Sequence, residues 1–198
     1  KEINLFTAHY LKRLYQKPKF IVYYHNCAKK PILDYKIDGY YKIPGGDRAA
    51  RYPYPSDSYA IMTWWDFGHI LTFIAHRIPN ANPFQQGVVE ANGTAGSAPF
   101  FVAYDEDKAK ANLDLLGSRY VIVDNQMAND FFGAISTWAQ DFNGWVEAFP
   151  WQNSTADGKV ESTMLIADSQ KYRDTMLYRL YYQDCKDLQH FRLVYETP

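Results

Sequence analysis

The chain of 198 residues has the length of one domain, and its 21 Lys and Arg residues nearly balance its 22 Asp and Glu residues, for a net charge of −1. That balance gives no electrostatic reason to expect a nucleic acid or an anionic lipid as partner. No apolar run approaches the roughly 20 residues that span a bilayer, and there is no signal-peptide h-region. We therefore expect a soluble domain excised from a longer protein.

The two cysteines, Cys27 and Cys185, do not have the spacing of metal ligands. One disulfide and two buried thiols both remain open, and we favour the thiols. Two glycosylation sequons, Asn92-Gly93-Thr94 and Asn153-Ser154-Thr155, lie in turn-like surroundings, although motifs this short are common by chance.

The first part of the chain predicts one helix and one strand. Apolar residues recur at helical spacing over residues 2–15, and Pro18 ends that helix. The β-branched and aromatic run over residues 20–24 predicts a strand. Residues 26–58 are irregular and punctuated by Gly and Pro, but their many tyrosines argue against disorder.

Two tryptophans are adjacent in the segment Trp64-Trp65-Asp66-Phe67-Gly68. Neighbouring side chains diverge in a helix and in a strand, so we expect one indole in the core and the other at a surface or in a pocket. The indole N–H groups are donors and the Asp66 carboxylate is an acceptor, so the three side chains together suit a small hydroxyl. The alternative is a helix start, with Asp66 as the N-cap and the tryptophans as packing.

The rest of the chain predicts alternating helices and strands. After the tryptophan pair we expect a helix over 70–77, a loop over 80–96, a helix over 105–116, a strand over 119–124, a helix over 126–138, a β-hairpin over 145–166, a helix over 171–182 and a strand over 191–195. Asp105 is an expected N-cap, and Gly117 follows the end of the same helix.

Strands separated by helices predict an α/β fold, with a helix-rich central core, a small and mostly buried sheet, and a β-rich insertion. We expect the core to comprise residues 1–144 and 168–198, and the insertion to comprise residues 145–167. Ligands of such sheets lie beyond the carboxyl ends of the strands. Asp124 is expected at the carboxyl end of a buried strand, so it is a candidate site residue.

The signatures of self-sufficient enzymes are absent: there is no GxSxG, no HExxH, no Walker loop and no GxGxxG. His69 and His76 are too far apart on one helix face to share a metal ion. The acidic run Asp105-Glu106-Asp107 is typical of a helix N-terminus rather than of a metal site. The residues alone therefore indicate an α/β domain with a conspicuous Trp-Trp-Asp segment and no evident reaction.

The segment Trp64-Trp65-Asp66-Phe67-Gly68 resembles the Trp-Trp-Asp-Tyr-Gly signature of the catalytic subunit of oligosaccharyltransferase, the enzyme of protein N-glycosylation. Three further segments resemble the family in the same order along the chain: Arg77-Ile78-Pro79-Asn80-Ala81-Asn82, Gly117-Ser118-Arg119-Tyr120-Val121-Ile122-Val123-Asp124 and Phe191-Arg192-Leu193-Val194-Tyr195-Glu196. We expect the short archaeal form, because the chain stops soon after the last of these segments.

This resemblance implies the acceptor-recognising part of a multi-pass enzyme of the cell membrane, on the extracellular face. A membrane part outside this chain would bind the divalent cation, Mn or Mg, and the lipid-linked oligosaccharide. No catalytic or metal-binding residue is then expected here, and the isolated domain would be inactive. The partner would be an acceptor polypeptide with Asn-x-Ser/Thr, and Trp64, Trp65 and Asp66 would bind the Ser or Thr hydroxyl.

Asp124-Asn125-Gln126-Met127 resembles an Asp-x-x-Met variant of the family's second motif, in which a lysine is absent. The resemblance adds Asp124 and Met127 to the acceptor site, where the flexible Met127 would contact the β-methyl of Thr. That contact is worth about one buried methyl, near 0.8 kcal/mol. Core packing for Met127 and an N-cap for Asp124 are the alternatives. Phe67 replaces the Tyr of the signature, which removes one hydroxyl.

Two other classes of protein remain open. One is a stand-alone aromatic-rich module that binds peptide or carbohydrate without catalysis. The other is a soluble hydrolase that uses Asp66 and Asp124 as a carboxylate pair. Hydrolysis by the isolated domain would favour the second of these, whereas hydrophobic spans upstream of Lys1 would favour the oligosaccharyltransferase.

Overall fold

The computed structural model describes residues 19–23, 59–75, 77–90, 93–141, 144–154 and 160–197. Within these ranges no helix is both long enough and apolar enough to cross a membrane. The helix predicted over 2–15, the irregular stretch 26–58, His76 and Asn92 lie outside them. Cys27 also lies outside, whereas Cys185 is a buried free thiol, as predicted for it.

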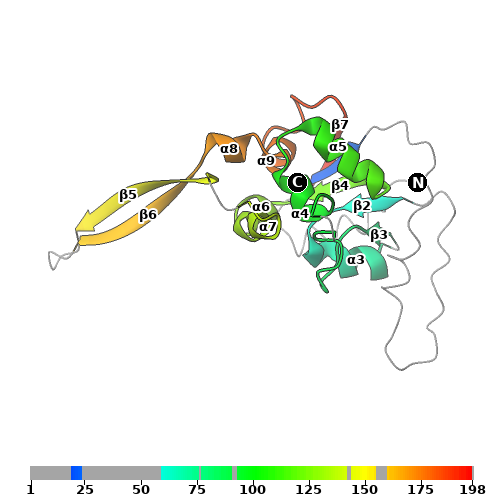
Figure 1. Cartoon of the computed structure of the whole chain (residues 1–198), viewed down its shortest axis with the longest axis horizontal. Coiled ribbons are helices and arrows are strands. Elements are labelled where there is room, and N and C mark those ends of the chain that lie inside the picture. The colour runs from blue at the N-terminus through cyan, green and yellow to red at the C-terminus, as the bar shows by residue number, and fades with distance from the viewer. Residues whose placement is uncertain are drawn as a thin grey trace, which may run out of the picture.

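A five-stranded sheet with the order β3-β2-β4-β1-β7 forms the centre of the fold (Figure 1). β2 runs parallel to β3 and to β4, whereas β1 pairs antiparallel with β4 and β7. The strands are β1 (Lys19–Tyr23), β2 (Ala60–Met62), β3 (Ile78–Pro79), β4 (Ser118–Val123) and β7 (Phe191–Glu196). The predicted α/β fold is confirmed, and so are the strands predicted at β1, β4 and β7.

Short helices pack around this sheet (Figure 1). They are the 3-10 turn η1 (Trp65–Phe67), α3 (Gly68–Phe73), α4 (Ser97–Val102), α5 (Glu106–Leu115), α6 (Asn125–Ala128), α7 (Phe132–Trp138), α8 (Gln170–Arg173) and α9 (Met176–Tyr181). The Asp105 side chain caps α5 by accepting from the backbone N–H groups of Asp107 and Lys108. Gly117 follows α5 with a φ of +64°, which favours glycine there. Both predictions for this helix are confirmed.

Two helices that the sequence predicted as continuous are each broken in two. The predicted helix 126–138 is α6 followed by α7, and the Asn129 amide at the break donates to the backbone oxygen and to Oδ1 of Asn125 at 2.9 and 2.8 Å. Such local side-chain bonds compete with helix continuation. The predicted helix 171–182 is α8 followed by α9. Thr175 is extended there (φ −68°, ψ 152°), and its hydroxyl accepts from the Tyr178 N–H as a new N-cap.

The predicted β-hairpin is confirmed. β5 (Val146–Ser154) and β6 (Val160–Asp168) pair antiparallel along their full lengths, as a two-stranded sheet of their own. In Figure 1 the hairpin projects away from the central sheet. This arrangement agrees with an insertion at 145–167, although the division of the chain into a core and an insertion stays a prediction.

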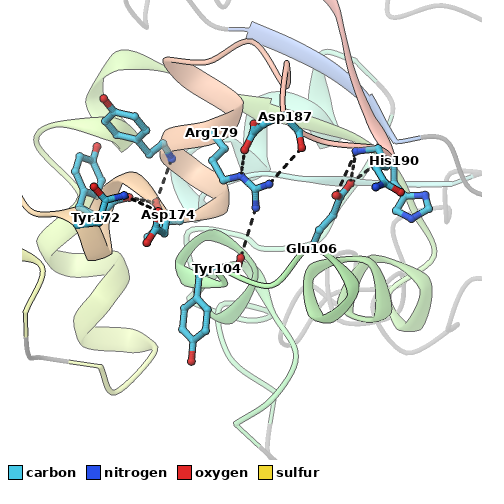
Figure 2. A network of polar contacts seen from close by, with 11 residues as sticks. Tyr104, Glu106, Tyr172, Asp174, Arg179, Asp187 and His190 are labelled. Carbon is cyan, nitrogen blue, oxygen red and sulfur yellow. Dashed lines mark hydrogen bonds and ion pairs between the residues drawn. The ribbon is translucent and has the colours of Figure 1, made fainter.

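Charged side chains tie the last part of the chain to the core, and we call Lys19, Glu106, Arg179, Asp184, Asp187 and Glu196 the C-terminal polar network. Figure 2 shows the part around α9, where Arg179 Nε donates to Asp187 Oδ2 at 2.6 Å. Glu106 Oε1 accepts from the backbone N–H groups of Gln189 and His190 at 2.9 and 2.7 Å. These contacts hold the segment before β7 against the start of α5.

Lys19 belongs to the same network and is only 8% exposed. Its Nζ donates to the Tyr181 carbonyl and to Asp184 Oδ1, both at 2.7 Å, and lies 3.4 Å from Glu196 Oε1. The hydrogen bond from Lys19 holds the pKa of Asp184 below its ordinary value. The buried ammonium is therefore compensated by two carboxylates and one carbonyl.

Candidate functional site

The parallel strands β2 and β4 deliver two polar segments to one edge of the sheet. Met62, the last residue of β2, pairs with Val121 of β4, and β4 ends two residues later at Val123. The chain leaving β2 reaches Trp64-Trp65-Asp66, and the chain leaving β4 reaches Asp124. The carboxyl ends of parallel strands are the usual ligand-binding edge of an α/β sheet. We call Trp64, Trp65, Asp66 and Asp124 the carboxyl-edge site.

The two tryptophans diverge as predicted. Trp64 is 1% exposed and belongs to the hydrophobic core, whereas Trp65 is half-buried and packs against that core. Their rings meet edge to face with centroids 6.4 Å apart. Within the part of the chain that the structure describes, neither indole N–H donates to another residue. Both donors therefore remain for a ligand or for solvent.

Asp66 does not cap a helix, so the alternative reading of this segment as a simple helix start is wrong in that respect. The N-cap position of η1 is Trp64, which is extended (φ −71°, ψ 157°), and Asp66 lies inside the 3-10 turn. Asp66 Oδ1 accepts from the Phe67 N–H at 3.0 Å. No hydrogen bond reaches Asp66 Oδ2 from the described residues, so this oxygen is left as an acceptor.

Asp124 is the N-cap of α6, as one reading of the sequence predicted. Its Oδ1 accepts from the Met127 N–H at 2.8 Å. The side chain is 0% exposed, and Oδ2 is buried without a hydrogen-bond partner. A buried carboxylate oxygen in this state is costly, because nothing replaces the water that it loses on folding.

Both carboxyl groups hold their protons more tightly than usual. Burial, and next the negative charge of Asp124, raises the pKa of Asp66 from 3.8 to about 7. Burial raises the pKa of Asp124 from 3.8 to about 6, against the opposing effect of the Met127 N–H bond and with a smaller contribution from Asp130. The effect of Asp124 on the pKa of Asp66 shows that the two carboxyls are electrostatic neighbours, and no described cation forms an ion pair with either.

Met127 and Phe67 lie beneath the site rather than on it. Both side chains are 0% exposed and belong to the hydrophobic core. The core packing that the sequence left open for Met127 is thus present, while its contact with an acceptor stays a prediction. The burial of Phe67 explains why a phenyl ring suffices where the signature has Tyr, since a hydroxyl there would need a partner in the core.

Two more polar side chains at the same ends of the parallel strands were not predicted from the sequence. Thr63 follows β2 and Asn80 follows β3, and both are buried with their side-chain polar atoms unpartnered. β2 and β3 are only three and two residues long, too short to show a strand period. Without those strands, nothing in the sequence marks Thr63 or Asn80 as neighbours of the tryptophans.

Metal ligands do not gather in the described ranges, where no group of three or more His, Cys, Asp or Glu side chains could hold an ion. Asp66 and Asp124 supply two carboxyls without a third ligand. The cation that the resemblance implies was expected outside this chain, and the described residues do not test that expectation.

The comparisons with known proteins identify relatives of this chain. The model of the AglB core domain family matches residues 25–128. Dolichyl-phosphooligosaccharide-protein glycotransferase 3 of Archaeoglobus fulgidus is 32% identical over 162 residues, which cover 74% of this chain and 19% of that protein. Dolichyl-monophosphooligosaccharide-protein glycotransferase AglB of Haloferax volcanii is 34% identical over 146 residues, covering 66% of this chain and 13% of that protein.

Solved structures give the same result. The Archaeoglobus fulgidus oligosaccharyltransferase in complex with Zn and sulfate is 27% identical with a TM-score of 0.63, over 83% of this chain and 23% of that one. The same enzyme tethered to an acceptor peptide with the NVT sequon is 28% identical with a TM-score of 0.61, over 81% and 21%. The chain thus spans about a fifth of the length of the glycotransferase 3 of Archaeoglobus fulgidus and of these two solved structures. It belongs to the AglB core domain family of archaeal oligosaccharyltransferases.

Proposed function

We propose that this chain is the acceptor-recognising domain of a membrane oligosaccharyltransferase, which transfers a lipid-linked oligosaccharide to Asn in Asn-x-Ser/Thr. One observation carries the proposal: the two indole N–H groups and one carboxylate oxygen of three consecutive residues just beyond β2 have no partner among the described residues. A hydroxyl has one hydrogen to donate and two lone pairs to accept. The indole N–H groups of Trp64 and Trp65 can donate to its lone pairs, and the Asp66 carboxylate can accept its hydrogen.

The same arrangement accounts for selectivity. An acceptor with Ala or Val in place of Ser or Thr leaves the partly buried Asp66 oxygen and the indole donors unpaired, at a cost of about 1–3 kcal/mol for each group. A site of this kind holds the acceptor Asn in position for transfer, and the chemistry itself takes place elsewhere. One solved relative carries a tethered acceptor peptide, and another is in complex with an inhibitory peptide and a dolichol-phosphate.

The whole protein, in this proposal, is a multi-pass protein of the cell membrane with this domain on the extracellular face. Its own transmembrane part binds the lipid-linked oligosaccharide and a divalent cation, Mn or Mg, and supplies the catalytic residues. The named relatives are glycotransferases that are several times longer than this chain. The domain is accordingly a part of a glycosyltransferase, inactive alone.

Asp66→Ala in the full-length protein tests the proposal. We expect loss of transfer to an Asn-x-Thr peptide, because the acceptor of the hydroxyl hydrogen is removed, while thermal unfolding of the protein changes little. Asp130→Ala is the matched control, since Asp130 is an exposed acid close to the site, and we expect this variant to retain transfer. Transfer at the wild-type rate by Asp66→Ala would overturn the assignment.

Met127 and Asp124 complete the proposed acceptor site as predicted from the resemblance. Because Met127 is fully buried, contact with a Thr methyl requires its side chain to be uncovered when the acceptor binds. Met127→Leu keeps the buried volume and removes the flexible thioether, so we expect a lower preference for Thr over Ser acceptors, by at most the roughly fourfold that 0.8 kcal/mol allows. The ratio of kcat/KM for the two peptides measures it. An unchanged ratio leaves Met127 a core residue only.

A module that binds peptide without catalysis remains the second candidate, because the site geometry would serve it equally. The two differ in what lies upstream of Lys1: ten or more hydrophobic spans in the same polypeptide support the oligosaccharyltransferase.

A hydrolase with Asp66 and Asp124 as its carboxylate pair is supported by their proximity. It requires the isolated domain to hydrolyse its substrate, which an activity screen on the purified domain decides.

A further inference from the structure

The two acids of the carboxyl-edge site form a cluster that the hydroxyl-binding role does not explain. Asp66 lies in the turn after β2 and Asp124 directly follows β4. These neighbouring strands are parallel, and Met62 at the end of β2 pairs with Val121 near the end of β4, so both carboxyls lie at the same edge of the sheet. Hydroxyl recognition uses only Asp66. One oxygen of Asp124 caps α6 by accepting from the Met127 N–H, and the other oxygen is buried without a hydrogen-bond partner.

The surroundings of the pair make two full negative charges unfavourable. No described Lys or Arg forms an ion pair with Asp66 or Asp124. The other titratable groups near them are Asp130, which follows α6, Tyr181 of α9, whose pKa Asp124 helps to raise, and His69, which follows Asp66 on α3. Like charges in a partly dry site without a counter-ion favour one proton between them.

We propose that Asp66 and Asp124 act as a single carboxyl pair that carries one proton while the acceptor site is empty, and that Asp124 is a positioning residue that controls the charge on Asp66. The inference rests on the proposed function, because the proton matters only if Asp66 receives the acceptor hydroxyl.

The proton has a defined path in this scheme. A Ser or Thr hydroxyl donates to an ionised Asp66 more strongly than to a neutral one, since hydrogen bonds to charged acceptors are the stronger ones. Acceptor binding therefore favours ionised Asp66, and the proton of the pair passes to the solvent. No bond other than O–H is made or broken, and the charge lost by the site appears as one proton in the buffer.

A pH profile of the full-length protein tests this. With an Asn-x-Thr peptide that has no group titrating between pH 5.5 and 8.5, KM should rise as the pH falls below the neutral range, by up to about tenfold per pH unit for one proton. In Asp124→Asn the same rise should begin at a lower pH, because the neighbouring charge is gone. Asp107→Asn is the matched control and should keep the wild-type midpoint and basal activity, because Asp107 is an exposed acid that affects the pKa of neither site carboxyl.

Two further measurements keep the test decisive. Asp124→Ser retains a capping oxygen without the charge, so it replaces Asp124→Asn if that variant does not fold. Calorimetry of peptide binding to the wild-type protein at pH 6, in two buffers of different ionisation enthalpy, should show release of close to one proton.

The outcomes separate the two proposals. An unshifted midpoint in both Asp124 variants, or no proton release at pH 6, overturns the carboxyl pair and leaves hydroxyl recognition by Asp66 standing. A KM in Asp66→Asn equal to that of the wild type at pH 8 overturns the proposed function itself. A KM that rises equally at every pH in the Asp124 variants assigns Asp124 a structural role only.

Discussion

The carboxyl-edge site and the C-terminal polar network differ in whether their charged side chains have partners of opposite charge or hydrogen bonds that compensate them. In the network, buried Lys19 has two carboxylates and a carbonyl, Arg179 has Asp187, and Glu106 binds two backbone N–H groups. In the site, Asp66 and Asp124 share an edge without a described cation, and Asp124 Oδ2 is buried without a partner. Charges compensated within the fold stabilise it, whereas uncompensated ones indicate where a ligand acts.

If that contrast is correct, the largest loss of stability comes from removing the buried cation of the C-terminal polar network. Lys19→Met leaves Glu196 without its cation and Asp184 with only the exposed Lys186. We expect the free energy of unfolding to fall by about 2–3 kcal/mol at pH 7, below the range for a fully buried pair because both acids are partly exposed. Urea unfolding measures it.

The pH dependence of this loss has a definite sign. Lys19 depresses the pKa of Asp184, so the pair stabilises the fold above the ordinary Asp range, near pH 4, and loses its effect as the pH falls through the lower folded value. The difference between the wild type and Lys19→Met should therefore shrink in acid. A difference that is the same at pH 7 and at pH 3 would show that Lys19 acts through packing instead.

Removing a charge from the carboxyl-edge site should raise the free energy of unfolding, whereas removing Lys19 from the network lowers it. The pKa of Asp124 is raised to about 6 in the folded state, so ionisation costs stability as the pH rises from about 4 to about 6, and the cost is constant above that. Asp124→Asn keeps an oxygen for the Met127 N–H and removes this cost. We expect the variant to be more stable than the wild type by about 1 kcal/mol at pH 8, and not at pH 4.

Asp105→Asn provides the matched control for that measurement. Asp105 is also an N-cap, with its Oδ1 accepting from the second and third residues beyond it, but it is exposed. Its substitution changes the same kind of N-cap, but the Asp105 carboxylate is hydrated. Removing its charge therefore relieves no cost of burying a charged group. If both variants gain stability equally at pH 8, the gain belongs to asparagine caps in general and the comparison of the two regions loses this support.

The sequence predicted the parts of this contrast that depend on local chemistry. Asp105 was expected as an N-cap, an N-cap was the alternative role for Asp124, and both residues are N-caps. The adjacent indoles diverge, as neighbouring side chains must. The strands β1, β4 and β7 are long enough to carry a β-branched or aromatic pattern.

What the sequence did not predict depends on tertiary contacts. β2 and β3 are strands only because β4 pairs with β2 and β2 with β3, and the juxtaposition of Asp66 with Asp124 follows from that pairing. The breaks at Asn129 and Thr175 were missed because the helical spacing of apolar residues continues across them. The network around Lys19 joins residues more than 160 positions apart, which no local pattern reveals.

The smallest expected change in stability comes from Glu106, whose carboxylate in the C-terminal polar network binds backbone N–H groups rather than a charged side chain. Glu106→Gln keeps one acceptor oxygen for the N–H groups of Gln189 and His190 and removes the negative charge, so we expect a loss of about 0.5–1 kcal/mol and a Tm lower by about 2 °C. Asp107→Asn, in the same helical turn, removes the same charge from the α5 N-terminus without touching those N–H groups. A larger loss in Glu106→Gln than in Asp107→Asn isolates the tie to the segment before β7. Equal losses would assign both to the helix dipole, and the compensation that distinguishes the network would then rest on Lys19 and Arg179 alone.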